Sequence, residues 1–167
     1  GLGALGLAKE ARSNLEAAMK IDPNALNGSA YTSLGTLYYR VPGFPVGFGD
    51  HDKARKLLQE ALKINPNGID PNYFYADFLV KEGEHAAALP YLEKAAKAPA
   101  RPGREVADKG RRAEIDALLD ALDLRLRLGI RRALVHLDED VPRARLVDDG
   151  RRVAAALLEQ LDDVESA

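Results

Sequence analysis

A repeated segment constrains the fold of this chain more than any other feature. The segment AKEARSNLEAAMKIDPN, residues 8–24, returns as HDKARKLLQEALKINPN, residues 51–67, at an offset of 43. A third copy, HAAALPYLEKAAKAP, occupies residues 85–99 and follows the second at an offset of 34. Ala, Leu and Ala recur in each copy at i, i+4 and i+7, which places them on one face of an α-helix. Small alanines let a neighbouring helix approach closely, so the sequence predicts stacked helical hairpins. The three triplets are Ala11-Leu15-Ala18, Ala54-Leu58-Ala61 and Ala88-Leu92-Ala95.

An offset of 34 residues is the period of the tetratricopeptide repeat (TPR). The stretch Tyr31-x-x-Leu34-Gly35-x-x-Tyr38 matches the first-helix half of its signature, with Tyr in place of Trp. We therefore predict an all-α fold, a TPR-like right-handed α-α superhelix of about two and a half repeats over residues 1–122. A charged helical extension is expected over residues 123–167. The first copy lacks an opening helix, which indicates that the chain is cut from a longer one.

Composition argues against several classes of function. The formal net charge is −2, so no basic field favours nucleic acid, and no apolar run reaches the length of a membrane span. The chain has no cysteine and only three scattered histidines, and no metalloprotease, P-loop or hydrolase motif occurs. His51 lies between Asp50 and Asp52, where a helix-capping Asp explains the pattern better than catalysis. We predict no catalytic residue, metal or cofactor.

The loop RVPGFPVGFGD, residues 40–50, carries about seven residues more than a tight hairpin turn needs. Two interpretations stay open. Phe44 and Phe48 fold back over the hairpin and are buried, with prolines stiffening the path. Alternatively, the loop forms one wall of a site for a partner or a small apolar ligand, since aromatics on a stiff loop lose little entropy on binding.

TPR arrays bind partners along the surface lined by the first helix of each repeat. Helical phase predicts that Tyr31, Tyr38 and Tyr75 are core residues and assigns other residues to the exposed inner face. The partner-binding or ligand-binding candidates are Thr32, Thr36, Tyr39, Arg40, Phe44, Phe48, Tyr73, Asp77 and Lys81.

A cluster of arginines precedes the last third of the chain. Arg101 and Arg104, followed by Arg111 and Arg112, could hold an anion at a helix start, where free amides point outward. The alternative is a solvated helix face on which they pair with Glu105, Asp108 and Glu114.

The extension carries conflicting patterns. LDLRLRLGI, residues 122–130, alternates like a strand, yet Ile115, Leu118, Leu119, Leu122 and Leu126 follow helical spacing that continues through Ile130, Leu134 and Leu137, and we predict a helix. Val153, Leu157 and Leu161 predict a last amphipathic helix that caps the array or mediates self-association. The acidic residues Asp138, Glu139, Asp140, Asp148 and Asp149 are read as solvated turn charges.

Three segments resemble a known family: VPGFPVGFGD, NGIDPNYFYADFL and RPGREVADKGRRAEIDALL. They are similar to bacterial TPR proteins of the T-component type of tripartite ATP-independent periplasmic (TRAP) transporters, over residues 1–122. The resemblance implies a periplasmic location, association with a solute-binding protein and a homo-oligomer enclosing a pore. A general protein-protein assembly scaffold, with a peptide or protein in the TPR groove, is the alternative function, and the cytoplasm is the alternative location.

Overall fold

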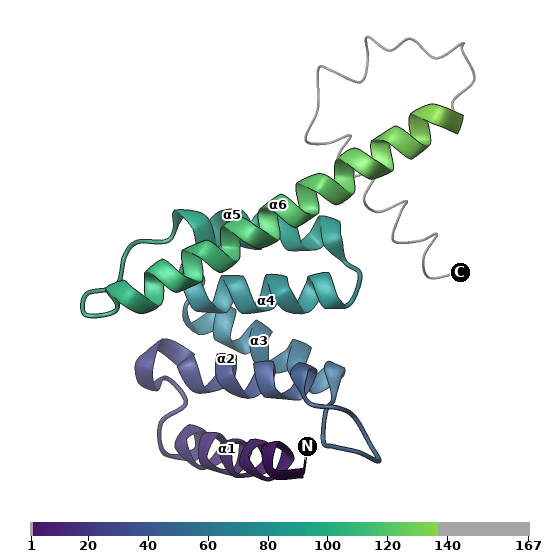
Figure 1. The fold of residues 1–167 in the computed structure, drawn as a ribbon. Coiled ribbons are helices and arrows are strands. Elements are labelled where there is room, and N and C mark those ends of the chain that lie inside the picture. The colour runs from purple at the N-terminus through teal and green to yellow at the C-terminus, as the bar shows by residue number, and fades with distance from the viewer. Residues whose placement is uncertain (1, 137–167) are drawn as a thin grey trace.

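The computed structural model describes residues 2–136, which form six α-helices and no strand (Figure 1). Consecutive helices pack against one another, and α2 also contacts α4, which contacts α6. The predicted all-α class is therefore confirmed. None of the described helices has the length and apolar character of a membrane span. The helices are α1 (Leu2–Ile21), α2 (Ala25–Arg40), α3 (His51–Ile64), α4 (Ile69–Lys81), α5 (His85–Lys97) and α6 (Glu105–His136).

Local chemistry sets the helix boundaries. α1 and α3 both end two residues before a proline of the repeat, since proline cannot continue the hydrogen-bond ladder. Asp50 caps α3, and its carboxylate accepts a hydrogen bond of 3.0 Å from the backbone N–H of Lys53. Gly83 makes the turn between α4 and α5 with a φ of +83°, a conformation that glycine adopts without steric cost.

The repeated triplets form the centre of the core. All six residues of the triplets in α3 and α5 are 0% exposed. Gly35 of α2 lies directly against α3, because a Cβ atom there would be 2.8 Å from Cγ of Leu58. The small side chains thus permit the close helix approach that their spacing predicts. Tyr38 and Tyr75 are buried as expected, whereas Tyr31 is only partly buried.

The linker between α1 and α2 contains a left-handed turn. Leu26, Asn27 and Gly28 have φ values of 50°, 56° and 76°, so the regular part of α2 begins after them. Gly28 is buried against Ile64, and a Cβ atom there would lie 3.1 Å from that side chain. This turn joins α1 to the regular part of α2.

The last helix extends the stack and then leaves it. Ile115 and Leu122 are buried in the shared core, and Figure 1 shows the later part of α6 projecting away from α4 and α5. α6 continues through residue 136, so the helical interpretation of residues 122–130 is correct and the strand is excluded. The helix crosses residue 122 without a break, and the division into two domains stays a prediction. Residues 137–167 lie outside the described part of the chain, together with Leu137, the predicted last helix and the acidic residues from Asp138 onward.

Candidate functional site

The starts of α2, α4 and α6 surround a cleft with a volume of about 630 Å³. α2 and α4 are the first helices of their hairpins, and α6 follows the last hairpin. We therefore call this cleft the first-helix groove. Its position agrees with the surface on which TPR arrays bind. Its lining consists of Leu26, Asn27, Ser29, Thr32, Ser33, Asn65, Ile69, Asp70, Pro71, Phe74, Arg101, Pro102, Arg104 and Arg111.

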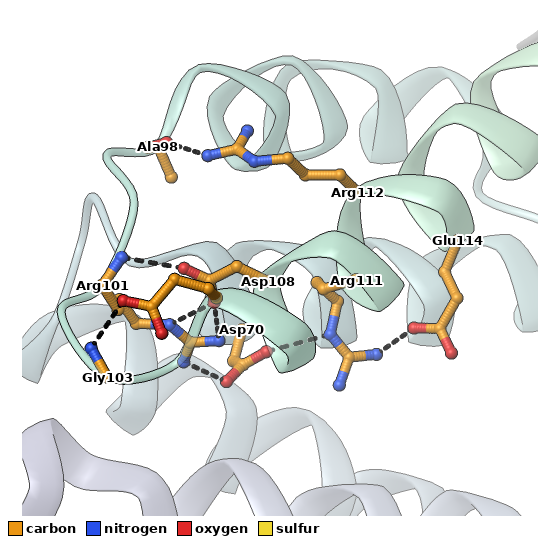
Figure 2. A network of polar contacts seen from close by, with 9 residues as sticks. Asp70, Ala98, Arg101, Gly103, Asp108, Arg111, Arg112 and Glu114 are labelled. Carbon is orange, nitrogen blue, oxygen red and sulfur yellow. Dashed lines mark hydrogen bonds and ion pairs between the residues drawn. The ribbon is translucent and has the colours of Figure 1, made fainter.

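Asp70, a residue of the groove lining, lies at the centre of a charged network (Figure 2). One carboxylate oxygen of Asp70 accepts from Nη1 of Arg101, and the other accepts from Nε of Arg111 at 2.9 Å. Arg101 also donates from Nε to Asp108 at 2.7 Å and from its backbone N–H to the same carboxylate at 2.8 Å. The network therefore fastens the linker before α6, and α6 itself, to the first turn of α4.

Arg112 fastens the same helix to the end of α5. Its guanidinium donates to the backbone carbonyls of Ala96 at 2.8 Å and Ala98 at 2.7 Å, and Figure 2 shows the second of these bonds. These carbonyls belong to the end of a helix, which lacks internal partners for them. Arg112 thus replaces the missing donors and is a structural residue.

The arginines at this end were predicted to form either an anion site or a solvated face. The predicted pairing is confirmed in part, because Arg101 pairs with Asp108 and Arg111 pairs with Glu114. The predicted solvated face is wrong, since Arg101 and Arg111 are only partly exposed and also hold Asp70, while Arg112 donates to backbone carbonyls. An anion site at Arg101 stays a prediction. Burial by itself lowers the pKa of the Arg101 guanidinium, but the hydrogen bonds to Asp108 and Asp70 outweigh it and raise the pKa. The hydrogen bonds from Arg101 hold the pKa of the Asp108 carboxyl below its ordinary value.

Arg104 differs from its neighbours in the network. It is exposed, lines the groove and pairs with no carboxylate within residues 2–136. A cation in this position can attract an acidic group of a partner without first giving up an internal ion pair. Its assignment as an anion-binding residue remains a prediction.

Phe74 is a groove residue that the sequence pattern did not reveal. Its ring lies in the groove lining under Arg111, whose guanidinium carbon is 4.2 Å from the ring centroid. The same guanidinium is 4.5 Å from the ring of Tyr73, which is itself buried. Helical phase placed Tyr73 on the exposed face, and the error arises because α6 covers it.

The opposite ends of α2 and α4 carry a second polar cluster, formed by Tyr39, Arg40, Asp77 and Lys81. The Tyr39 hydroxyl and Nη2 of Arg40 both donate to Oδ2 of Asp77, each at 2.6 Å. Lys81 Nζ lies 5.4 Å from the centroid of the Tyr39 ring. The structure thus brings these four predicted residues together.

Within this cluster, however, Tyr39 is not exposed as predicted. Its ring packs edge-on against Phe78, and the residue is only 5% exposed. Burial, followed by the hydrogen bond to Asp77, raises the pKa of the Tyr39 phenol, which keeps it protonated and donating. Arg40 and Lys81 are the exposed cations of the cluster.

Thr32 and Thr36 contribute less exposed surface than predicted. Thr32 is buried, although it reaches the groove lining, and Thr36 is partly buried. The Thr36 hydroxyl donates to the Thr32 carbonyl at 2.8 Å, within its own helix. Neither hydroxyl group is therefore presented on the surface in the way that helical phase suggested.

The two phenylalanines of the loop have different environments. Phe48 is partly buried, with its ring 5.8 Å from Tyr38 in an edge-on arrangement and 4.6 Å from the guanidinium carbon of Arg12. Phe44 is 94% exposed, so the predicted burial is wrong for this residue. The loop is closed by its own backbone, since the N–H of Gly49 donates to the Pro42 carbonyl at 2.9 Å and the N–H of Gly47 donates to the Gly43 carbonyl at 3.0 Å.

A smaller cleft lies between this loop and the start of α1. It has a volume of about 540 Å³ and a mostly apolar lining. Arg40 supplies the charged group at its edge and is already held by Asp77. The other lining residues are Ala4, Leu5, Ala8, Val41, Pro42 and Val46.

His51 pairs with a carboxylate at the C-terminal end of α4. Nδ1 of His51 lies 2.5 Å from Oε1 of Glu82, and the imidazole packs edge-on against Phe78. Asp50 is engaged as the helix cap, which confirms that interpretation of the Asp-His pair. Over residues 2–136, no group of three or more His, Cys, Asp or Glu side chains could hold a metal ion.

Comparison with known families supports the repeat. Residues 46–108 match the family model of the tetratricopeptide repeat, a span that contains α3, α4 and α5. Comparison with curated proteins gave no significant match. The chain thus contains a TPR region, which implies a role in protein-protein interaction, and TPR regions are typically not catalytic.

Proposed function

We propose that this chain is a non-catalytic interaction protein that binds a segment of a protein partner in the first-helix groove. The observation that carries the proposal is the groove itself, a cleft of about 630 Å³ at the starts of α2, α4 and α6 within and beside the TPR region. Its lining combines hydroxyl and amide groups with the ring of Phe74 and the exposed Arg104. Such a mixture suits an extended peptide, which needs hydrogen-bond partners for its backbone as well as an apolar contact.

The charges favour a partner segment with an acidic residue. Asp70 is neutralised by two guanidinium groups, so Arg104 is the groove cation without an internal partner among the described residues. An acidic side chain entering the groove would meet Arg104 without repulsion from an unpaired carboxylate of the lining.

Photo-crosslinking tests the location. A benzophenone amino acid at Ser33, which is exposed and lines the groove, should crosslink a defined partner in cells of the native host. The same group at Lys56, exposed on α3 away from the groove, should not crosslink that partner. Equal crosslinking from the two positions would contradict the proposal.

A charge exchange then tests the role of Arg104. Arg104→Glu should weaken binding of the crosslinked partner by about tenfold, because the new carboxylate would repel the acidic residue of the partner. Lys109→Glu makes the same change of charge at an exposed position of α6 outside the groove lining and should leave the affinity within about twofold. Equal losses from both variants would show that overall charge, and not the groove, determines binding.

The smaller cleft supports a second candidate function. The chain would be a subunit that works with a solute-binding protein of a transport system, and the apolar space of about 540 Å³ beside the Phe44 loop would take an apolar solute. This proposal also rests on the resemblance to TRAP T-component proteins, which implies the periplasm and a homo-oligomer.

Native mass spectrometry should detect a bound small molecule that is lost in Val46→Asp and retained in Lys63→Asp. A chain without any bound molecule and without oligomers would count against it.

The location of the protein is a separate part of this second candidate. Fractionation of native cells should recover the protein with the periplasmic fraction. Recovery with the cytoplasm would instead favour the assembly-scaffold function.

A further inference from the structure

The first-helix groove continues along α2 and α4 as two matched rows of residues. Positions 29, 33, 36 and 40 of α2 have the same spacing as positions 70, 74, 77 and 81 of α4, and each set falls within an arc of about 60° on its helix. The rows lie side by side, because Ser33 and Phe74 line the groove at one end and Arg40 donates to Asp77 at 2.6 Å at the other. We call these two rows the α2–α4 track.

The track contains two carboxylates, and both are paired with arginines of the chain. Asp77 is held by Arg40. Asp70 lies between Arg101 and Arg111, as Figure 2 shows. An anionic segment lying on the track would therefore meet no unpaired carboxylate in either row, and the charges of the track do not repel it.

Lys81 is the cation at the α4 C-terminal end of the track. It is exposed, and its Nζ lies 5.4 Å from the centroid of the Tyr39 ring. Within residues 2–136 no ion pair joins Lys81 to a carboxylate, and the adjacent Glu82 pairs with His51 instead. Lys81 can therefore pair with a carboxylate of a partner without breaking an ion pair of the described chain.

Arg104 is the corresponding cation at the opposite end. It lines the groove beside the start of α4, and the adjacent Glu105 accepts from the backbone N–H of Gly103 at 3.0 Å. From Asp70 to Lys81 the row on α4 spans about 16 Å at about 1.5 Å per residue. An extended chain covers that distance in about five residues.

We infer that the partner segment is extended and carries two acidic residues four to six positions apart, one pairing with Arg104 and the other with Lys81. Between these ends the segment passes over the partly exposed ring of Phe74 and the exposed hydroxyl groups of Ser29 and Ser33. These groups supply an apolar contact and hydrogen bonds to an extended backbone. The inference rests on the proposed function, because it names the chemistry of the partner in the same groove.

Selection of short random peptides displayed on phage, with the whole chain as the immobilised target, tests the spacing. Enriched peptides should carry two Asp or Glu residues four to six positions apart. The same selection on a Lys81→Gln chain should lose the preference for one of the two acidic positions. Enriched peptides with a single acidic residue, or with two at no preferred separation, would overturn the inference.

Anisotropy titrations with one enriched, fluorescein-labelled peptide then assign each acidic residue to its cation. Lys81→Gln should weaken binding about threefold to fivefold, and neutralising one particular acidic residue of the peptide should cause no further loss in that variant. Arg104→Gln should give a similar loss that is coupled to the other acidic residue. Lys56→Gln, at an exposed position of α3 away from the groove, should leave the affinity within about twofold. All three positions are exposed, so circular dichroism should show the wild-type helix content in each variant.

The possible outcomes distinguish this inference from the proposed function. If Arg104→Gln weakens binding and Lys81→Gln behaves like Lys56→Gln, a partner with one acidic anchor occupies the groove, and only the inference is wrong. Coupling of both variants to the same acidic residue would overturn it as well, because the two cations would then not meet opposite ends of the segment. No enriched peptide, or no loss in either variant, would contradict both the inference and the proposed function. Separate coupling to two acidic residues supports both.

Discussion

Replacing two helical glycines by alanine should change stability in opposite directions. Gly35 of α2 faces α3, where an added Cβ would lie 2.8 Å from Cγ of Leu58 and 3.3 Å from the carbonyl oxygen of Ala54. Gly110 of α6 has no atom within 4 Å of an added Cβ. Both glycines lie inside helices, so the effect of the substitution on the backbone is the same at the two sites. The sites differ in the atoms that the added methyl group meets.

The magnitudes follow from these contacts. Alanine in place of glycine in a helix interior stabilises by about 1 kcal/mol. At Gly35 this gain is opposed by overpacking of about 1–3 kcal/mol, because Leu58 is fully buried and the Ala54 carbonyl is backbone. We expect Gly110→Ala to raise the free energy of unfolding by about 1 kcal/mol and Gly35→Ala to lower it by about 1 kcal/mol.

Urea unfolding followed by circular dichroism measures the difference. In thermal scans the two variants should differ by about 4–8 °C in Tm, given about 2–4 °C per kcal/mol for a chain of this size. A double-mutant cycle with Leu58→Ala should show coupling of about 1–2 kcal/mol, because the truncated side chain no longer meets the new methyl group. Equal stabilisation by both glycine substitutions, or zero coupling to Leu58, would refute the close α2–α3 packing.

Three further predictions test other contacts. The pKa of Asp108 in the folded state is below its ordinary value of 3.8. The stability that Asp108 contributes is therefore present above pH 3.8 and is lost as the pH falls through the lower pKa of the folded state. Urea midpoints of Asp108→Asn should accordingly vary less between about pH 5 and pH 2 than those of the wild type. Burial and the hydrogen bond to Asp77 raise the pKa of Tyr39 above its ordinary 10.0, so its contribution is present below pH 10.0 and is lost as pH rises through the folded pKa. Tyr39→Phe should lose less stability than the wild type in that alkaline range. Absorbance at 295 nm should show the same number of tyrosines ionising in the native state of both proteins, because Tyr39 stays protonated there. Phe44→Ala should change the free energy of unfolding by no more than about 0.5 kcal/mol, whereas Phe48→Ala should lower it by about 2 kcal/mol, and urea midpoints report both. Equal effects from the two phenylalanine variants would contradict the environments described for the loop.

Patterns within single helices predicted most of the fold. The Ala-Leu-Ala spacing identified α3 and α5 and the faces that they bury, and the family match over residues 46–108 agrees with the repeat. Prolines after α1 and α3, and Gly83 after α4, end these helices through effects on the backbone that are local. The helical interpretation of residues 122–130 was also correct, since helical spacing continues on both sides of the short alternating run.

The candidate site was less predictable, because its residues meet across long sequence separations. Asp70 pairs with Arg101 and Arg111, which are 31 and 41 positions away, and several acidic residues near the arginines were equally plausible partners in the sequence. Phe74 was missed since nothing in its own helix distinguishes an aromatic residue in a groove from one in the core. The role of Arg104 as the exposed cation followed only from the pairing of its neighbours.

By itself the sequence determined that this chain folds as stacked helical hairpins and which face of α3 and α5 is buried. Those properties depend on the period of a helix and on residue size, which can be read along the chain. Only the tertiary structure decided that Tyr39 and Tyr73 are covered and that Phe44 is exposed. Helical phase gives the direction in which a side chain leaves its helix, whereas exposure depends on whether another helix lies in that direction.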